Sequence, residues 1–67
     1  MAKIQLNGKR ITIRSQETIY SLLKKLNLNN KNIAIEHKGI IVPKIRLNKI
    51  FLKNNDKLEV VHFIGGG

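Results

Sequence analysis

Cysteine and tryptophan are absent from this chain of 67 residues, and only one proline is present. Without cysteine the chain can form no disulfide, no Cys-based zinc site and no thiol nucleophile, and it can carry no persulfide or thioester on a side chain. No apolar run has the length of a membrane span, and the alternation of apolar and polar residues from Lys3 onward is unlike a signal peptide. These absences predict a cytoplasmic protein that is stabilised by packing alone.

The apolar residues that are present are mostly isoleucine, leucine and valine, and the hydrophobic fraction is 42%. Aromatic residues are limited to Tyr20, Phe51 and Phe63. This composition predicts a folded domain and argues against a disordered chain. We expect one small domain over residues 1–64, monomeric when free, followed by a flexible glycine tail over residues 65–67.

Acidic residues are scarce, so the net charge is +9, from 13 Lys and Arg against 4 Asp and Glu. Such a charge would suit an anionic partner. The cations are scattered, however, with no run longer than the Lys24 and Lys25 pair, and lysine, asparagine and isoleucine share codons rich in A and T. We therefore favour compositional bias over nucleic-acid binding as the origin of the charge.

The first structural pattern is a pair of alternating segments, residues 4–6 and 11–13, on either side of Asn7 and Gly8. An Asn-Gly step between alternating segments predicts a β-hairpin. Behind it, apolar residues recur at the spacing of one helical face, with Thr18 or Ser15 available as N-cap and an asparagine-rich stretch at 27–32 as the end. The predicted helical face consists of Ile19, Leu22, Leu23 and Leu26.

Four further segments follow the helix. Residues 33–36 alternate as a strand, and a turn at Lys38 and Gly39 leads to a short return at 40–42, which Pro43 ends. Residues 44–52 are expected to form a loop with one turn of helix, and a turn at 54–56 leads into the last strand over 57–64.

This order predicts an α+β fold of the β-grasp, or ubiquitin-like, type: a mixed sheet of four to five strands with one main helix packed on one face. A helix after a hairpin can cross the sheet and return a later strand parallel to the first. The helix is expected to pack on one set of sheet residues: Ile4, Leu6, Ile11, Ile13, Ile33, Ile35, Leu58 and Val60.

Groupings of residues that carry out catalysis are missing. His37 and His62 lie on different strands without a third ligand, and each is expected to be a half-exposed surface residue. The four acids are spread out, and Asp56 stands where a turn residue is expected. No glycine-rich loop precedes the helix. We therefore predict no catalytic residue, no metal site and no bound cofactor, and the chain is not expected to be an enzyme.

The end of the sequence is its most unusual part, because Gly65, Gly66 and Gly67 directly follow the last apolar strand. A tail of this composition is thin enough to enter the active-site channel of another protein. Alternation along the strand places Glu59, Val61 and Phe63 on the sheet face that the helix does not cover. We predict that Val61, Phe63 and Ile64 dock a partner beside the tail.

Three segments resemble the sulfur carrier family of thiamine biosynthesis: Ile-Ala-Ile-Glu at 33–36, Ile-Val-Pro-Lys at 41–44, and the run from Asn55 through Glu-Val-Val-His-Phe-Ile-Gly-Gly-Gly. The resemblance covers the whole chain in length and element order. Three features depart from the family pattern. Asn55 replaces a common glycine, Lys44 replaces a frequent arginine, and residues 44–49 contain no tryptophan.

The resemblance implies a role and a set of partners. An E1-like enzyme would use ATP to adenylate the carboxylate of Gly67, sulfur from a cysteine desulfurase persulfide would displace AMP, and thiazole synthase would take the sulfur from the resulting thiocarboxylate. Gly65 and Gly66 would thread into the partner. No cofactor is bound by the carrier, and no membrane is involved.

Two alternatives remain open from the sequence. The first is another β-grasp carrier or modifier, serving molybdopterin synthesis or tRNA thiolation or joined to lysines, because the Gly-Gly ending is shared among such proteins. The second is a small basic nucleic-acid-binding module, which only the net charge supports, since stacking aromatics at sheet spacing are lacking.

Overall fold

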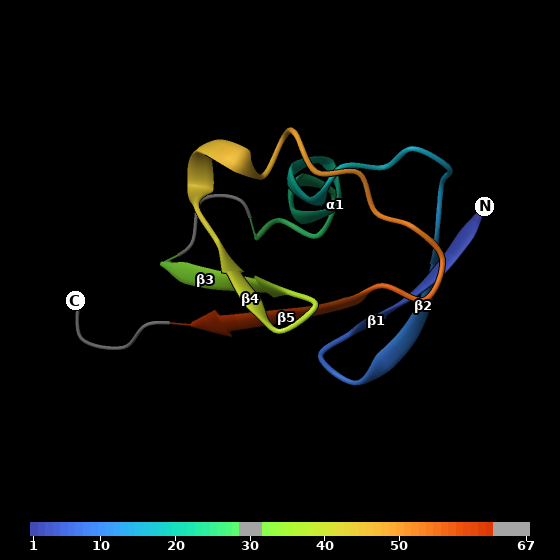
Figure 1. Ribbon diagram of the computed structural model, residues 1–67, viewed down its shortest axis with the longest axis horizontal. Coiled ribbons are helices and arrows are strands. Elements are labelled where there is room, and N and C mark those ends of the chain that lie inside the picture. Colours follow the sequence, from blue (N-terminus) through green and yellow to red (C-terminus); the bar gives the residue numbers. More distant parts are fainter. Residues whose placement is uncertain (29–31, 63–67) are drawn as a thin grey trace.

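The computed structural model describes residues 1–28 and 32–62 of the chain. A five-stranded sheet carries a single α-helix on one face, and the other face is left uncovered by any described helix (Figure 1). In chain order the elements are β1 (Ala2–Leu6), β2 (Lys9–Ile13), α1 (Ile19–Lys25), β3 (Ile33–His37), β4 (Ile40–Val42), the 3-10 helix η1 (Lys44–Arg46) and β5 (Lys57–His62).

The strand order in the sheet is β2-β1-β5-β3-β4, which places the last strand of the chain in the middle. β5 pairs parallel with β1 on one side and antiparallel with β3 on the other. The remaining neighbours, β1 with β2 and β3 with β4, are antiparallel hairpins. The predicted α+β arrangement, a mixed sheet with one main helix, is therefore confirmed.

Both hairpins turn through two residues with positive φ. Asn7 and Gly8 have φ values of 51° and 82°, and Lys38 and Gly39 have values of 55° and 80°. Two consecutive left-handed residues are the backbone requirement of a type I′ turn, whose twist matches that of the strands, and Asn-Gly meets it with the least strain. The predicted turns are confirmed at both places.

The helix begins where a capping box predicts that it should. The Thr18 hydroxyl accepts a hydrogen bond from the backbone N–H of Ser21, and the Ser21 hydroxyl accepts one from the backbone N–H of Thr18. The two side chains together satisfy two of the donors that every helix start leaves unpaired. Of the two predicted N-caps, Thr18 is the one used.

The prediction that Leu26 belongs to the buried helical face is wrong. The helix ends at Lys25, and Leu26 is 43% exposed as its C-cap. Asn27 follows with a φ of 59°, which turns the chain, and Leu28 packs against the core instead. Because Asn27 is left-handed, the helix ends early, and the residue that packs against the core is Leu28, two positions after Leu26.

The core lies between α1 and the sheet. Predicted core residues of the helix and sheet are buried, except for Leu26, which is exposed, and for Leu6 and Ile11, which are only partly buried. Four further residues join them, two of which come from the irregular segment between η1 and β5: Ala2, Val42, Leu47 and Leu52. The expected turn of helix within residues 44–52 is η1.

Backbone hydrogen bonds fasten this irregular segment to the start of the helix. The N–H of Ile19 donates to the carbonyl of Ile50 at 3.1 Å, and the N–H of Tyr20 donates to the carbonyl of Leu47 at 2.9 Å. The N–H of Leu52 donates to the carbonyl of Glu17 at 2.7 Å. Residues 47–52 therefore form a fixed wall beside α1, although they contain no regular element longer than a bridge.

The last strand is confirmed from Lys57 to His62, and the predicted continuation to residue 64 lies outside the described residues. The boundary between a domain at 1–64 and a tail at 65–67 lies there too and stays a prediction. No helix in the described part of the chain is long and apolar enough to cross a membrane.

Candidate functional site

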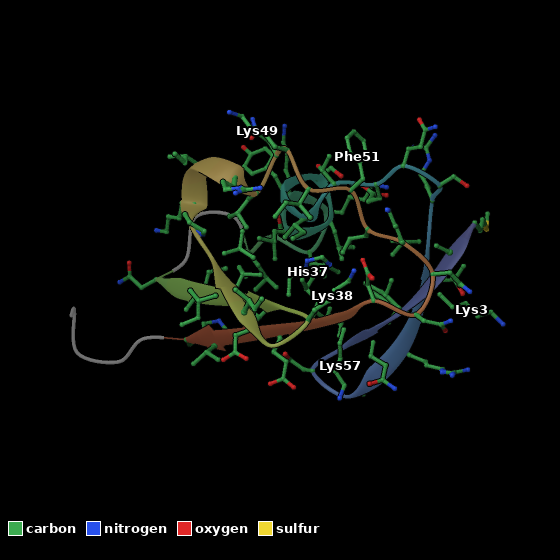
Figure 2. The ribbon with its side chains drawn as sticks, viewed as in Figure 1. Lys3, His37, Lys38, Lys49, Phe51 and Lys57 are labelled. Carbon is green, nitrogen blue, oxygen red and sulfur yellow. The ribbon has the colours of Figure 1, made fainter. Side chains whose placement is uncertain are left out.

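The candidate site is the uncovered face of the sheet where β5 leads toward the terminal glycines. Leu58 and Val60 of β5 are buried against the core, so the alternation of the strand turns Glu59 and Val61 to the opposite face. Val61 is 46% exposed, as expected for a docking residue. Figure 2 shows Lys57, two positions before Glu59, pointing away from α1 on this same side.

The sheet register brings two further residues to this face. Glu36 of β3 lies directly opposite Glu59 of β5 and, on its other side, opposite Ile41 of β4. Ala34 lies opposite Val61. We call Ile41, Glu36, Glu59 and Val61 the outer-face cluster. Sequence reasoning found Glu59 and Val61 but missed Glu36 and Ile41, although Ile33 and Ile35 pointing inward already implied that Glu36 points outward.

Like charges directly across two strands normally destabilise a sheet. Glu36 and Glu59 form such a pair, and no described cation makes an ion pair with either. The other two acids, Glu17 and Asp56, are both buried and paired with cations. In a chain of net charge +9, two of its four acids therefore share one open face without a partner in the described residues.

The other half of the same face is basic. A shallow hollow there is lined by residues of β1, β2 and the start of β5, among them Lys3, Arg10 and Lys57. The outer face thus changes sign from β1 to β3. A partner surface with the reverse order of charges would be both attracted and oriented.

Five of the predicted site residues cannot be placed, because Phe63, Ile64, Gly65, Gly66 and Gly67 lie outside the described residues. Their roles in docking, threading and chemistry stay predictions. Within the described part of the chain, no group of three or more His, Asp or Glu side chains could hold a metal ion.

The prediction that His37 is a half-exposed surface residue is wrong. Its side chain is only 14% exposed, and its Nε2 lies 2.9 Å from Oδ2 of Asp56, on the helix side of the sheet (Figure 2). The N–H of Lys53 donates to the same oxygen at 2.9 Å, and Lys38 Nζ lies 3.7 Å from Oδ1. The group joins the β3–β4 turn to the start of β5, so it stabilises the fold.

Burial alone would raise the pKa of Asp56, but the hydrogen bonds from His37 and Lys53 and the charges of His37 and Lys38 outweigh it, so the pKa is lowered. The pKa of Glu17 is also lowered, first by the hydrogen bond from Ser21 and then by that from Lys25. In both cases the folded state favours the ionised carboxylate.

These shifts predict loss of stability in acid. A carboxyl with a lowered folded pKa contributes stability above its unfolded pKa, about 3.9 for Asp and 4.3 for Glu, and loses it as pH falls through the folded value. We expect thermal unfolding temperatures to change little on this account between pH 7 and 5 and to fall below about pH 4. Melts from pH 2 to 7 test this, and Asp56→Asn should flatten the acid side. An equally steep acid side in Asp56→Asn would contradict the assignment.

The sequence of the chain matches a known protein family. A sequence model of the ThiS family matches residues 4–67. The chain belongs to the ThiS family. The resemblance to the sulfur carriers of thiamine biosynthesis is therefore confirmed. The match runs through the terminal glycines, so it includes the predicted reactive end.

Relatives of this ThiS family member fall into two groups by length. Sulfur carrier protein ThiS of Bacillus subtilis is 38% identical over 65 residues, which cover 96% of this chain and 98% of that protein. Thiazole synthase of Paramagnetospirillum magneticum is 35% identical over 65 residues, 97% of this chain but only 20% of that protein. The chain thus spans about a fifth of the length of that thiazole synthase.

The fold is also shared with a solved structure. The crystal structure of the thiamine biosynthesis protein ThiS from Geobacter metallireducens superimposes with a TM-score of 0.84 at 24% identity. The alignment covers 97% of this chain and 99% of that one. This likeness confirms the ubiquitin-like architecture of the sheet and helix.

Proposed function

We propose that this chain carries sulfur for thiazole formation in thiamine biosynthesis, as a protein substrate and not as a catalyst. The observation that carries the proposal is the family match, which extends through Gly67. The strand that precedes the terminal residues, β5, lies in the centre of the sheet. No group that could hold a metal ion is found among the described residues, and the proposal assigns activation of the terminus to a partner.

The chemistry requires two steps at the carboxylate of Gly67. A carboxylate resists attack by sulfur until it is activated, so an E1-like enzyme joins one of its oxygens to the α-phosphorus of ATP and releases pyrophosphate. A persulfide sulfur then attacks the carbonyl carbon, and AMP leaves with its electron pair. After the sulfur–sulfur bond is reduced, the terminus is a thiocarboxylate.

Thiazole synthase is the proposed acceptor of this sulfur. A relative of this chain forms one fifth of a thiazole synthase from Paramagnetospirillum magneticum, which supports a functional link between the carrier and that enzyme. In the proposed complex, Gly65 and Gly66 thread into the partner because they have no side chain, and Val61, Phe63 and Ile64 dock beside them.

Intact-mass spectrometry tests the proposal. The chain is incubated with its E1-like enzyme, ATP, a cysteine desulfurase, cysteine and a thiol reductant. The expected result is a mass increase equal to the exchange of one oxygen for one sulfur, located on Gly67 by fragmentation and absent without ATP. Modification elsewhere in the chain would overturn the proposal. So would the absence of any mass change under conditions in which the same E1-like enzyme loads another carrier.

The outer-face cluster gives a second test. Val61→Asp places a third carboxylate beside Glu36 and Glu59 and removes an apolar contact, so we expect about a tenfold lower rate of thiocarboxylate formation at subsaturating carrier, about 1.4 kcal/mol of binding. Ile45→Asp is the matched control, because Ile45 is an apolar residue that is 79% exposed on η1, away from this face of the sheet. Equal rates for the two variants would contradict docking on this cluster.

A further inference from the structure

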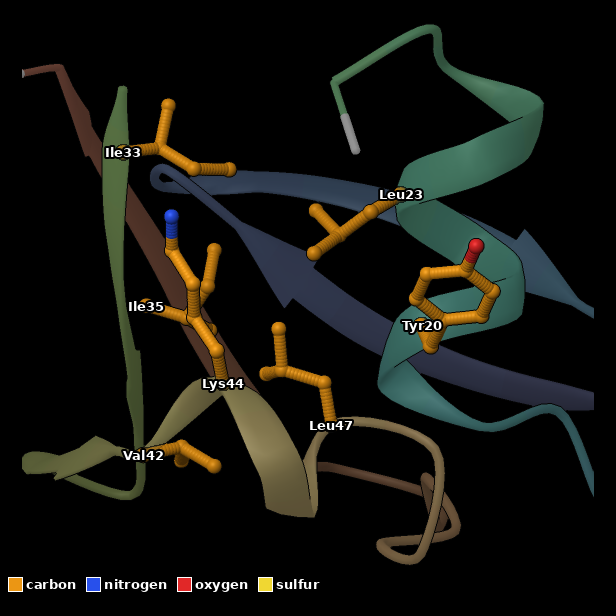
Figure 3. Close-up of a pocket in the computed structure, with 7 residues that line it drawn as sticks. All are labelled: Tyr20, Leu23, Ile33, Ile35, Val42, Lys44 and Leu47. Atoms are coloured by element: carbon orange, nitrogen blue, oxygen red, sulfur yellow. The ribbon is translucent and has the colours of Figure 1, made fainter. Parts of the chain in front are cut away.

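A cavity on the helix side of the sheet is not used by the proposed function. It lies between α1, η1 and the strands β3 and β4, and its volume is about 140 Å³ (Figure 3). The residues that line it are Tyr20, Leu23, Ile33, Ile35, Val42, Lys44 and Leu47. It is separated from the outer-face cluster by the thickness of the sheet.

The walls of this cavity are apolar and fixed. Leu23 and Ile35 are 1% and 2% exposed, and Leu47 is held beside the helix by the 2.9 Å hydrogen bond from the Tyr20 N–H to its carbonyl. A dry apolar cavity of about 150 Å³ is large enough to bind benzene. The volume therefore fits one six-membered ring or a branched group of similar size, without rearrangement of the walls.

Two polar groups stand at the rim. Figure 3 shows the Lys44 side chain extending from η1 toward Ile33, and the Tyr20 side chain on α1 at the other end of the cavity, with its hydroxyl directed away from Leu47. Lys44 is exposed and makes no ion pair with a described residue. No acidic residue is among the described residues that line the cavity. The rim therefore offers an ammonium and a hydroxyl beside an apolar chamber.

We propose that this cavity binds a small apolar monocarboxylate, with its ring or branched group inside and its carboxylate at Lys44. The volume limits the apolar part to about six or seven heavy atoms by comparison with benzene. The unpaired ammonium selects an anion over a neutral compound of the same shape. None of the described residues that line the cavity belongs to the outer-face cluster, so the site is separate from the proposed docking face.

Phenylacetate is the probe that tests this site, with phenylacetamide and acetate as comparisons. Titrations are followed by methyl chemical shifts in NMR spectra of the full chain. We expect the largest shifts at Leu23, Ile35, Val42 and Leu47, with a dissociation constant of about 0.1–1 mM for phenylacetate. Phenylacetamide should bind about five- to tenfold more weakly, and acetate should leave these methyl groups unmoved.

Variants separate the chamber from the cation. Leu47→Phe fills the chamber and should abolish phenylacetate binding, and Val42→Leu provides a second filling variant if the first does not fold. Lys44→Gln should weaken phenylacetate about five- to tenfold and leave phenylacetamide unchanged. Lys49→Gln is the matched control, since this lysine is close in sequence but does not line the cavity, and it should bind like the original chain.

Three results would overturn the proposal. The first is shifts confined to methyl groups outside the cavity. The second is binding that survives in a folded Leu47→Phe or Val42→Leu variant. The third is an equal loss of affinity in Lys44→Gln and Lys49→Gln, which would reduce the anion preference to the overall positive charge. None of these results bears on loading of Gly67, so the proposed function is tested separately.

Discussion

Deletion of Gly67 is expected to abolish thiocarboxylate formation while the domain stays folded. One residue of extended chain spans about 3.3–3.6 Å, so the new terminal carboxylate would stop short of the atoms that the activating enzyme positions. A misplacement of about 1 Å can already cost a hundredfold in rate, so we expect a loss of at least about a hundredfold. The described core ends at Val60, seven residues before the deletion, and should be unaffected.

The measurement is the intact mass after incubation with the E1-like enzyme, ATP and the sulfur source, together with circular dichroism melts. Deletion of Met1 is the matched control, because it removes one residue from the other end and Met1 is 92% exposed. It should load at the normal rate. If the chain without Gly67 gains sulfur as fast as the Met1 deletion, the terminal residue is not the site of chemistry.

Leu58→Ala is expected to have the largest effect on stability. Leu58 is fully buried near the start of β5, opposite Leu6 of β1 and His37 of β3. Truncating a buried leucine to alanine costs about 2–5 kcal/mol, because the cavity only partly collapses. At about 0.05–0.15 kcal/mol per residue, a domain of this size has about 3–10 kcal/mol in total. The variant should therefore lose much of its stability and unfold partly at 37 °C.

Urea unfolding at 25 °C measures this loss, with Val61→Ala as the matched control on the same strand. Val61 is also apolar and is half-exposed on the opposite face, so its truncation should cost less than about 1 kcal/mol. The two variants should also differ in function. Val61→Ala remains folded and loads more slowly, whereas Leu58→Ala loads normally in its folded fraction. Similar losses of stability in both would mean that β5 does not have the two faces described.

Local patterns predicted the elements well wherever one short stretch held all the information. Asn7 and Gly8 specify a turn by their backbone preferences, and the Thr18 cap fixes the start of the helix within four residues. Leu26 was misplaced because helical spacing continues through a residue that the left-handed Asn27 has already taken out of the helix. The preference of Asn27 for the left-handed conformation ends the helix before the spacing of apolar residues ends.

Contacts between distant parts of the chain were beyond the same reasoning. His37 and Asp56 are 19 positions apart, and nothing near either one signals that β3 and the turn before β5 meet. Leu47 and Leu52 are buried without periodicity, because hydrogen bonds to the start of α1 and not a regular element hold them. Burial in an irregular segment leaves no repeating pattern to find.

Some features of the candidate site depend on one strand alone, and others depend on contacts between strands. Alternation in β5 predicted that Val61 faces away from the helix, which one strand alone determines. The acidic pair needed the register of β3 against β5, because Glu36 and Glu59 become neighbours only when His37 is aligned with Leu58. A shift of one residue would have separated them, and no sequence signal excluded such a shift.

The central place of β5 has a mechanical consequence if, as proposed, the end of the chain is drawn into other enzymes. A strand at the edge of a sheet can be peeled away one hydrogen bond at a time. β5 pairs with β3 from Leu58 to His62 and with β1 at Lys57 and Leu58, so force along its axis loads these ladders in shear. Tension at the carboxyl end is therefore borne by the whole sheet, and the domain can be pulled against a partner without unravelling from the end that is gripped.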